Sequence, residues 1–113
     1  YGGAFPVWLA PVQAVLIPIT DKQLDYCWAV AKKLKKAGIR VEVDDTRDRM
    51  GNKIRKAQEQ KVPYMLVVGK REVEAEAVSV RLRTGEDLKA KSVNEFLAIA
   101  KAVIDARSKE LVL

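Results

Sequence analysis

Histidine is absent from this 113-residue chain, and Cys27 is its single cysteine. Without histidine the chain lacks the commonest metal ligand and the commonest general base. A single cysteine excludes an internal disulfide and fits a reducing compartment. Because Cys27 falls on the apolar stripe of a predicted helix, we interpret its thiol as inert core. The composition therefore argues against a metal centre and against acid–base catalysis.

Long apolar runs are also missing. No stretch approaches the roughly 20 apolar residues that a membrane span requires. Residues 12–19 are apolar, but the run is short, contains Pro18 and follows no basic segment, so we predict neither a signal peptide nor a membrane contact. The chain opens on Tyr1 rather than methionine, and we interpret it as a piece of a longer protein.

Cations outnumber anions in this chain. It has 21 Lys and Arg against 15 Asp and Glu, a formal net charge of +6 and a pI near 9.6. With 49% hydrophobic and 32% charged residues, its length suits one soluble domain with one core. The basic excess favours an anionic partner, with nucleic acid first. Solubility alone is the alternative.

The hydrophobic pattern predicts strands that alternate with helices. We predict buried strands at residues 12–19, 39–44 and 64–68. Thr20 and Gln23 form a capping box for a first helix, which ends at Gly38. A second, basic helix is predicted from about residue 50 to 60. Strands joined by helices in this way should be parallel, with right-handed crossovers.

The second half of the chain predicts shorter segments. We predict short segments at residues 72–74 and 78–83, a basic loop at 89–91 and a final helix to about residue 109. Apolar and polar residues alternate in the second segment, so one of its faces should be buried. Ser92 and Glu95 form the capping box of the final helix. Residues 1–11 are interpreted as a linker into a domain over residues 12–113.

Arginine occurs at positions where it could read a nucleic-acid base. Arg55 flanks the buried stripe of the second helix, and its fork could contact phosphate or guanine. The alternative is a solvated cation that pairs with Glu59. Arg81 and Arg83 share the polar face of one strand, and Glu72 lies on a neighbouring segment, an arrangement that can read a splayed base. The alternative is a weak ion pair, which spacing alone favours.

Several motifs occur in order along nearly the whole chain. They are AFPVWLAPVQ at residues 4–13, AGIRV at 37–41, GNKIR at 51–55, KVPYMLVVG at 61–69, EVE at 72–74 and VSVRLR at 78–83. In this order they resemble the C-terminal anticodon-binding domain of the threonyl-tRNA synthetase family. The GxKIR and VPYM motifs are shared in weaker form with prolyl, histidyl and glycyl relatives, whereas FPxWLAPVQ is more specific to the threonyl family.

The resemblance implies an α/β fold with three layers, α/β/α, around a mixed five-stranded sheet of order 2-1-3-4-5, with strand 4 antiparallel and three helices. It implies a domain that binds the anticodon loop of threonine tRNA and reads the second and third anticodon bases, a G and a U. The fragment itself would catalyse nothing and hold no cofactor. Its parent would be a homodimeric threonine–tRNA ligase, cytoplasmic or organellar. A catalytic domain earlier in the parent chain would use ATP, Mg and Zn.

The resemblance also assigns roles to single residues. Arg55, Glu72 and Arg81 match family residues that contact the anticodon bases. Phosphate attraction is expected from the surrounding cations, namely Lys53, Lys56, Lys61, Arg83, Lys89 and Lys91. Lys61 stands where relatives often have arginine, so the charge is kept and the fork is lost. Asp48 stands where some relatives have asparagine, and its carboxylate would repel phosphate. The turn at residues 75–77 lacks the glycine that relatives often have there.

Three alternatives stay open at this point. The first is the anticodon domain of a related class IIa synthetase with another amino-acid specificity. The second is a non-catalytic paralogue that serves protein or nucleic-acid interaction. The third is a small-molecule enzyme on a doubly wound fold, against which the missing histidine and the missing glycine-rich loop argue.

Overall fold

A five-stranded mixed sheet organises residues 7–105, which are the residues that the computed structural model describes. The strands are β1 (Ala14–Pro18), β2 (Val41–Val43), β3 (Tyr64–Val68), β4 (Ala77–Leu82) and β5 (Asp87–Ser92). The helices are α1 (Leu24–Lys36), α2 (Met50–Glu59), α3 (Lys70–Ala75) and α4 (Val93–Asp105), with 3-10 turns η1 (Val7–Leu9) and η2 (Asp21–Gln23). The order is β2-β1-β3-β4-β5, and β4 is antiparallel to both neighbours. The predicted sheet is confirmed.

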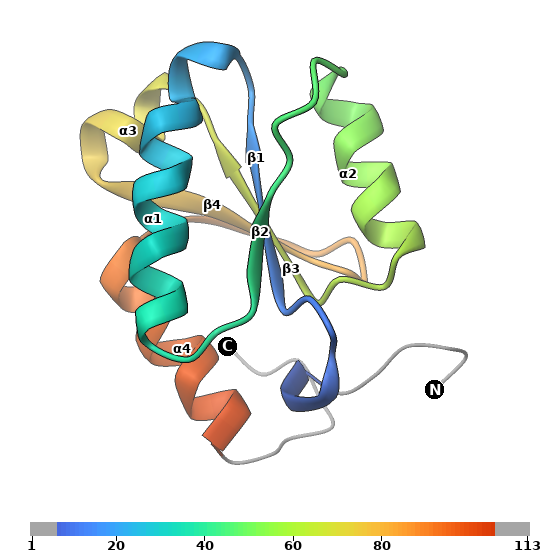
Figure 1. Ribbon diagram of the computed structural model, residues 1–113, viewed down its shortest axis with the longest axis vertical. Coiled ribbons are helices and arrows are strands. Elements are labelled where there is room, and N and C mark those ends of the chain that lie inside the picture. Colours follow the sequence, from blue (N-terminus) through green and yellow to red (C-terminus); the bar gives the residue numbers. More distant parts are fainter. Residues whose placement is uncertain (1–6, 106–113) are drawn as a thin grey trace.

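Helices cover both faces of this sheet (Figure 1). Helices α1 and α4 lie on one face, and α2 lies on the other. Leu66 belongs to the cluster of the first face together with Phe96 of α4. Its neighbour Met65 points to the opposite face and clusters with Ala57 of α2. Alternate residues of β3 thus serve two cores, which explains why the strand is apolar throughout.

Helix α1 begins and ends at the predicted signals. The main-chain N–H of Thr20 donates to the side chain of Gln23 (2.9 Å), which completes a capping box at η2, the turn that leads into α1. At the other end Gly38 has φ +89°, and the N–H of Ile39 donates to the carbonyl of Leu34 (3.1 Å). This is the Schellman arrangement, and the left-handed position requires glycine or strain.

Helix α2 ends in the same arrangement without glycine. The N–H of Val62 donates to the carbonyl of Ala57 (3.1 Å), and the N–H of Lys61 donates to that of Gln58 (3.0 Å). Lys61 has φ +60°, in the left-handed region. A residue with a Cβ pays roughly 1–2 kcal/mol for this backbone conformation, which glycine does not. The backbone at the end of α2 is therefore strained, and a glycine at position 61 would remove this strain.

We expect Lys61→Gly to raise the free energy of unfolding by about 0.5–1 kcal/mol, because relief of the left-handed strain outweighs the entropy that glycine loses on folding. Urea unfolding followed by circular dichroism measures the change. Gly38→Ala is the matched control and should lower stability by about 1 kcal/mol, because it introduces a Cβ at the equivalent position of α1. A loss of stability in Lys61→Gly would contradict the prediction.

Two segments differ from the prediction. Residues 72–74, one of the predicted short segments, lie in the short helix α3, so the structure adds a fourth helix to the three predicted. Local capping explains α3, because the carboxylate of Glu72 accepts the N–H of Gly69 (2.7 Å). Residues 89–91, predicted as a loop, belong to the edge strand β5. Pairing with β4 forms this strand, and Leu88 and Ala90 are too few apolar residues to predict it.

The segment before β1 packs on the sheet. Val7 is 1% exposed, and the side chain of Gln13 donates to its carbonyl (3.0 Å). Arg40 donates to the carbonyls of Trp8 and Ala10. Residues 1–6 and the predicted end of the last helix lie outside the described residues, and the domain boundary after residue 11 stays a prediction. Among residues 7–105, no helix is long and apolar enough to span a membrane.

Candidate nucleic-acid interface

Part of the sheet face that carries α2 is open to solvent. Helix α2 packs over the middle of the sheet, where Met65 lies, and Met65 pairs with Arg81 of β4. Ser79 and Arg81 point to this face, since Val78, Val80 and Leu82 are buried on the other. Beyond them on β5, Asp87 and Ala90 are exposed. We call Ser79, Arg81, Asp87 and Ala90 the open sheet surface.

Arg81 is the cation of the open sheet surface. One terminal nitrogen, Nη2, lies 3.9 Å from Oδ2 of Asp87, and both side chains are 37% exposed. Its Nε is buried and has no hydrogen-bond partner within the described residues. An exposed ion pair at this separation contributes little to stability. The exposed part of the Arg81 guanidinium, not its buried Nε, therefore remains available to a ligand on this surface.

Arg55 lies on the flank of α2 that looks toward β4. Ile54 and Ala57 face the sheet, and Lys56 and Gln60 line a pocket on the β2 side of the helix. Successive helix residues are about 100° apart, so Arg55 projects from the opposite flank. Its side chain is exposed. The structure thus directs Arg55 and Arg81 to the same side of the molecule, and their contact with RNA bases stays a prediction.

Glu72 does not pair with Arg81. It lies in α3, after the end of β3, and one carboxylate oxygen caps that helix through the N–H of Gly69. Within residues 7–105 no hydrogen bond or ion pair joins Arg55, Glu72 and Arg81 to one another. The carboxylate beside Arg81 is that of Asp87, which sequence reasoning missed. A base-reading role for Glu72 stays a prediction.

Two further cations lie where α2 and β4 end. Arg83 donates from Nη1 to the carbonyl of Lys61 (3.4 Å), and its N–H donates to the carbonyl of Pro63 (3.1 Å). Partial burial lowers the pKa of Arg83 from its ordinary value. The side chain of Lys61 is exposed. Arg83 therefore ties the end of β4 to the end of α2, and Lys61 extends the basic character of this side.

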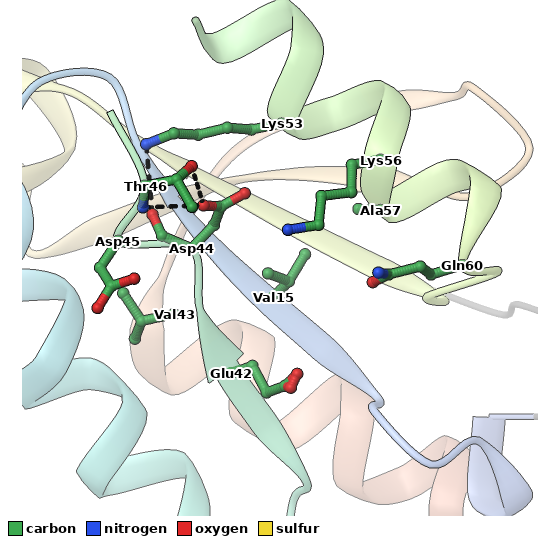
Figure 2. Close-up of a pocket in the computed structure, with 10 residues that line it drawn as sticks. All are labelled: Val15, Glu42, Val43, Asp44, Asp45, Thr46, Lys53, Lys56, Ala57 and Gln60. Carbon is green, nitrogen blue, oxygen red and sulfur yellow. Dashed lines mark hydrogen bonds between the residues drawn. The ribbon is translucent and has the colours of Figure 1, made fainter. Parts of the chain in front are cut away.

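Lys53 is buried rather than presented to solvent. It is 5% exposed, and its Nζ donates to the main-chain carbonyls of Asp44 (3.3 Å) and Pro18 (3.5 Å). Figure 2 shows this side chain reaching from α2 to the end of β2. The two carbonyls belong to the ends of neighbouring parallel strands. A phosphate contact from Lys53 would require the ammonium to leave both acceptors.

A pocket of about 160 Å³ lies between α2 and β2 (Figure 2). Lys56 and Gln60 line it from the helix, and Glu42 and Asp44 line it from the strand. The carboxylates of Asp44 and Asp45 point apart (Figure 2). No cluster of three or more His, Cys, Asp or Glu side chains that could bind a metal occurs in residues 7–105. Lys56 thus lies away from the open sheet surface.

The remaining predicted cations lie on β5. Lys89 is exposed and has φ +67°, next to the irregular pairing between β4 and β5. Lys91 is half-buried and pairs with Val78, whose side chain belongs to the face of α1 and α4. Directly paired residues share a face of a sheet, so Lys91 points away from Arg81. The predicted set of cations is therefore spread over several surfaces.

Asp48 and Cys27 have local roles. The carboxylate of Asp48 accepts the side-chain amide of Asn52 (2.9 Å) and the N–H of Arg49 (2.8 Å) at the start of α2. These two hydrogen bonds, the Asn52 bond foremost, lower the pKa of the Asp48 carboxyl. Cys27 is fully buried, and burial raises the pKa of its thiol to about 12. This placement confirms Cys27 as core.

This sequence is similar to one protein family and to sequences of known function. The family model described as "Anticodon binding domain" matches residues 13–103. A threonine–tRNA ligase from Nitratidesulfovibrio vulgaris is 52% identical over 102 residues, which are 90% of this chain and 16% of that protein. One from Clostridium botulinum is 53% identical over 108 residues, 96% of this chain and 17% of that protein. The chain therefore spans only a small part of these relatives.

Solved structures share the fold. The RNA-binding domain of threonyl-tRNA synthetase from Cryptosporidium parvum superposes with a TM-score of 0.85 and 29% identity, over 90% of this chain and 26% of that one. Prolyl-tRNA synthetase from the same organism, in complex with halofuginone and AMPPNP, gives a TM-score of 0.80 and 29% identity. That match covers 91% of this chain and 22% of the other.

Proposed function

Because this chain belongs to the anticodon-binding domain family, we propose that it recognises the anticodon loop of threonine tRNA on behalf of a threonine–tRNA ligase. Support for threonine comes from relatives of that activity, which are about half identical over at least 90% of the chain. The observation that supports an RNA-binding surface is the open sheet surface, where the Arg81 side chain is 37% exposed and Arg55 is exposed on the flank of α2 that looks toward β4.

In this proposal the open sheet surface receives unpaired anticodon bases. Single-stranded loops expose the base edges that side chains can read. The forks of Arg55 and Arg81 match the acceptor pairs of a base such as guanine. Lys61 and Lys89 are exposed and supply phosphate attraction that falls as salt rises. We further propose that the second and third anticodon bases, G and U, are the ones read.

The chemistry of aminoacylation would lie elsewhere in the parent protein. An anticodon-binding domain is not itself catalytic, and the composition provides no histidine for acid–base work. We propose that the parent attaches threonine to tRNA with ATP through a separate catalytic domain and acts as a cytoplasmic homodimer. The role of this chain in that reaction is to select the tRNA by its anticodon.

A second candidate is the same role in a prolyl enzyme. The prolyl-tRNA synthetase structure is as identical to this chain as the threonyl structure is, at 29%. Because the proline and threonine anticodons differ, the affinities for hairpins with the two anticodons distinguish the two candidates. A proline anticodon hairpin therefore belongs in the test.

The test is fluorescence anisotropy at low salt with the proline anticodon hairpin and two further RNA hairpins, called cognate and swapped. The cognate hairpin carries the threonine anticodon stem and loop, and the swapped hairpin exchanges its second and third anticodon bases. We expect the cognate hairpin to bind at least about 10-fold more tightly, since each mismatched base typically costs about 1–3 kcal/mol. Equal affinity for both hairpins would contradict base reading and leave only a basic surface.

A further inference from the structure

Asp87 is an acid placed beside the cation that the proposed function uses. Its Oδ2 lies 3.9 Å from Nη2 of Arg81. Its Oδ1 accepts the main-chain N–H of Lys89 (2.8 Å). Lys89 holds φ +67° at this point, where the pairing of β4 and β5 shifts register. The backbone therefore holds the Asp87 carboxylate in place, with its second oxygen toward the arginine.

Such an acid is an unexpected companion for a cation that meets RNA. A carboxylate accepts hydrogen bonds only and repels a phosphate that approaches the same guanidinium. A base edge is uncharged and is not repelled in this way. The ion pair also leaves the Arg81 side chain available to RNA, because the contact is long and 37% of the side chain is exposed.

We propose that Asp87 is a specificity-determining residue: it keeps Arg81 from acting as a phosphate contact and so reserves its donors for base edges. The inference rests on the proposed function, since it assumes that Arg81 meets the anticodon. It assigns Asp87 a role by repulsion, which is how proteins commonly reject a wrong partner. Asp87 would lower the affinity for RNA in general and would raise the ratio between the affinities for the cognate and the swapped hairpin.

The substitution D87N isolates the charge. Its amide keeps an oxygen for the N–H of Lys89, so the turn should be retained, while the repulsion of phosphate is lost. E86Q is the matched control, because it removes one charge from the adjacent exposed residue. Glu86 takes part in the turn through its main-chain carbonyl, which accepts the N–H of Leu82 (2.9 Å). Circular dichroism and thermal unfolding confirm that each variant of the 113-residue chain folds.

We expect D87N to bind the swapped hairpin about 3- to 10-fold more tightly and the cognate hairpin no more than about 2-fold more tightly. The salt dependence should steepen by about 0.7 in the slope of log K against log salt, the value for one additional phosphate on a single strand. E86Q should change the affinities for the cognate and the swapped hairpin by the same factor, and this factor should be smaller than the effect of D87N on the swapped hairpin. The ratio of the two affinities therefore falls in D87N alone.

Three results would overturn the inference. D87N could behave like E86Q, with an unchanged ratio and slope. It could instead lose cognate affinity, which would make Asp87 a direct contact of the RNA. If the unsubstituted chain shows no preference between the hairpins, both the inference and the proposed function fail. That last case is recognised from the unsubstituted chain by itself, so the two failures are distinguishable.

Discussion

Arg81→Ala is expected to weaken binding of the cognate hairpin by about 10- to 100-fold and binding of the swapped hairpin by less than about 3-fold. A bidentate arginine contact to a base contributes about 1–3 kcal/mol of discrimination, and its loss should fall on the hairpin that presents the right base. Anisotropy titrations at one fixed salt concentration measure both affinities. Arg81 offers little to the fold, since its ion pair is long and exposed.

Arg81→Lys is the control that separates charge from geometry. Lysine keeps the cation but lacks the planar fork, so it should lose most of the discrimination and retain most of the phosphate attraction. Equal weakening of both hairpins in Arg81→Ala, with full recovery in Arg81→Lys, would make Arg81 a phosphate contact. That result would remove the residue from base reading and would also deprive Asp87 of its proposed role.

The fold was predictable because its signals are local and strong. Strand β3 is apolar at every position, Gly38 ends α1 in a left-handed conformation, and the Thr20 capping box leads into that helix. The order of the strands came from the family resemblance, not from these local patterns. The segments that were mispredicted, α3 and β5, contain few apolar residues, because capping forms the helix and edge pairing forms the strand.

The site was predictable only in part, because partners across a sheet depend on register. Alternation along β4 placed Arg81 on a polar face, and the structure agrees. No sequence pattern reveals that Asp87, six residues later, returns beside Arg81 across an irregular β4–β5 pairing. Lys53 was predicted to attract phosphate, and that role stays a prediction. Its burial could not be predicted from a basic helix, because it depends on two strand ends that the fold brings beneath the side chain.

Lys53→Ala is expected to lower the free energy of unfolding by about 2–4 kcal/mol. The substitution removes a buried aliphatic stem and leaves a cavity. It also removes the donor that serves the carbonyls of Pro18 and Asp44, and an unpaired buried acceptor costs about 1–3 kcal/mol. Urea unfolding measures the loss. Lys56→Ala, on the exposed side of the same helix, is the control and should stay within about 0.5 kcal/mol.

Lys53→Met decides between a role in the fold and a role in RNA binding. Methionine fills a similar volume and donates no hydrogen bond. Lys53→Met should therefore recover the part of the lost unfolding free energy that is due to packing, but not the part that is due to the two hydrogen bonds. If Lys53 serves the fold, the folded variant binds the cognate hairpin with an unchanged salt slope. A slope that becomes shallower by about 0.7 in a fully stable variant would mean that the ammonium leaves its two carbonyls for a phosphate. The ends of β1 and β2 would then belong to the RNA surface, and the interface would extend across α2 to the pocket beside Lys56.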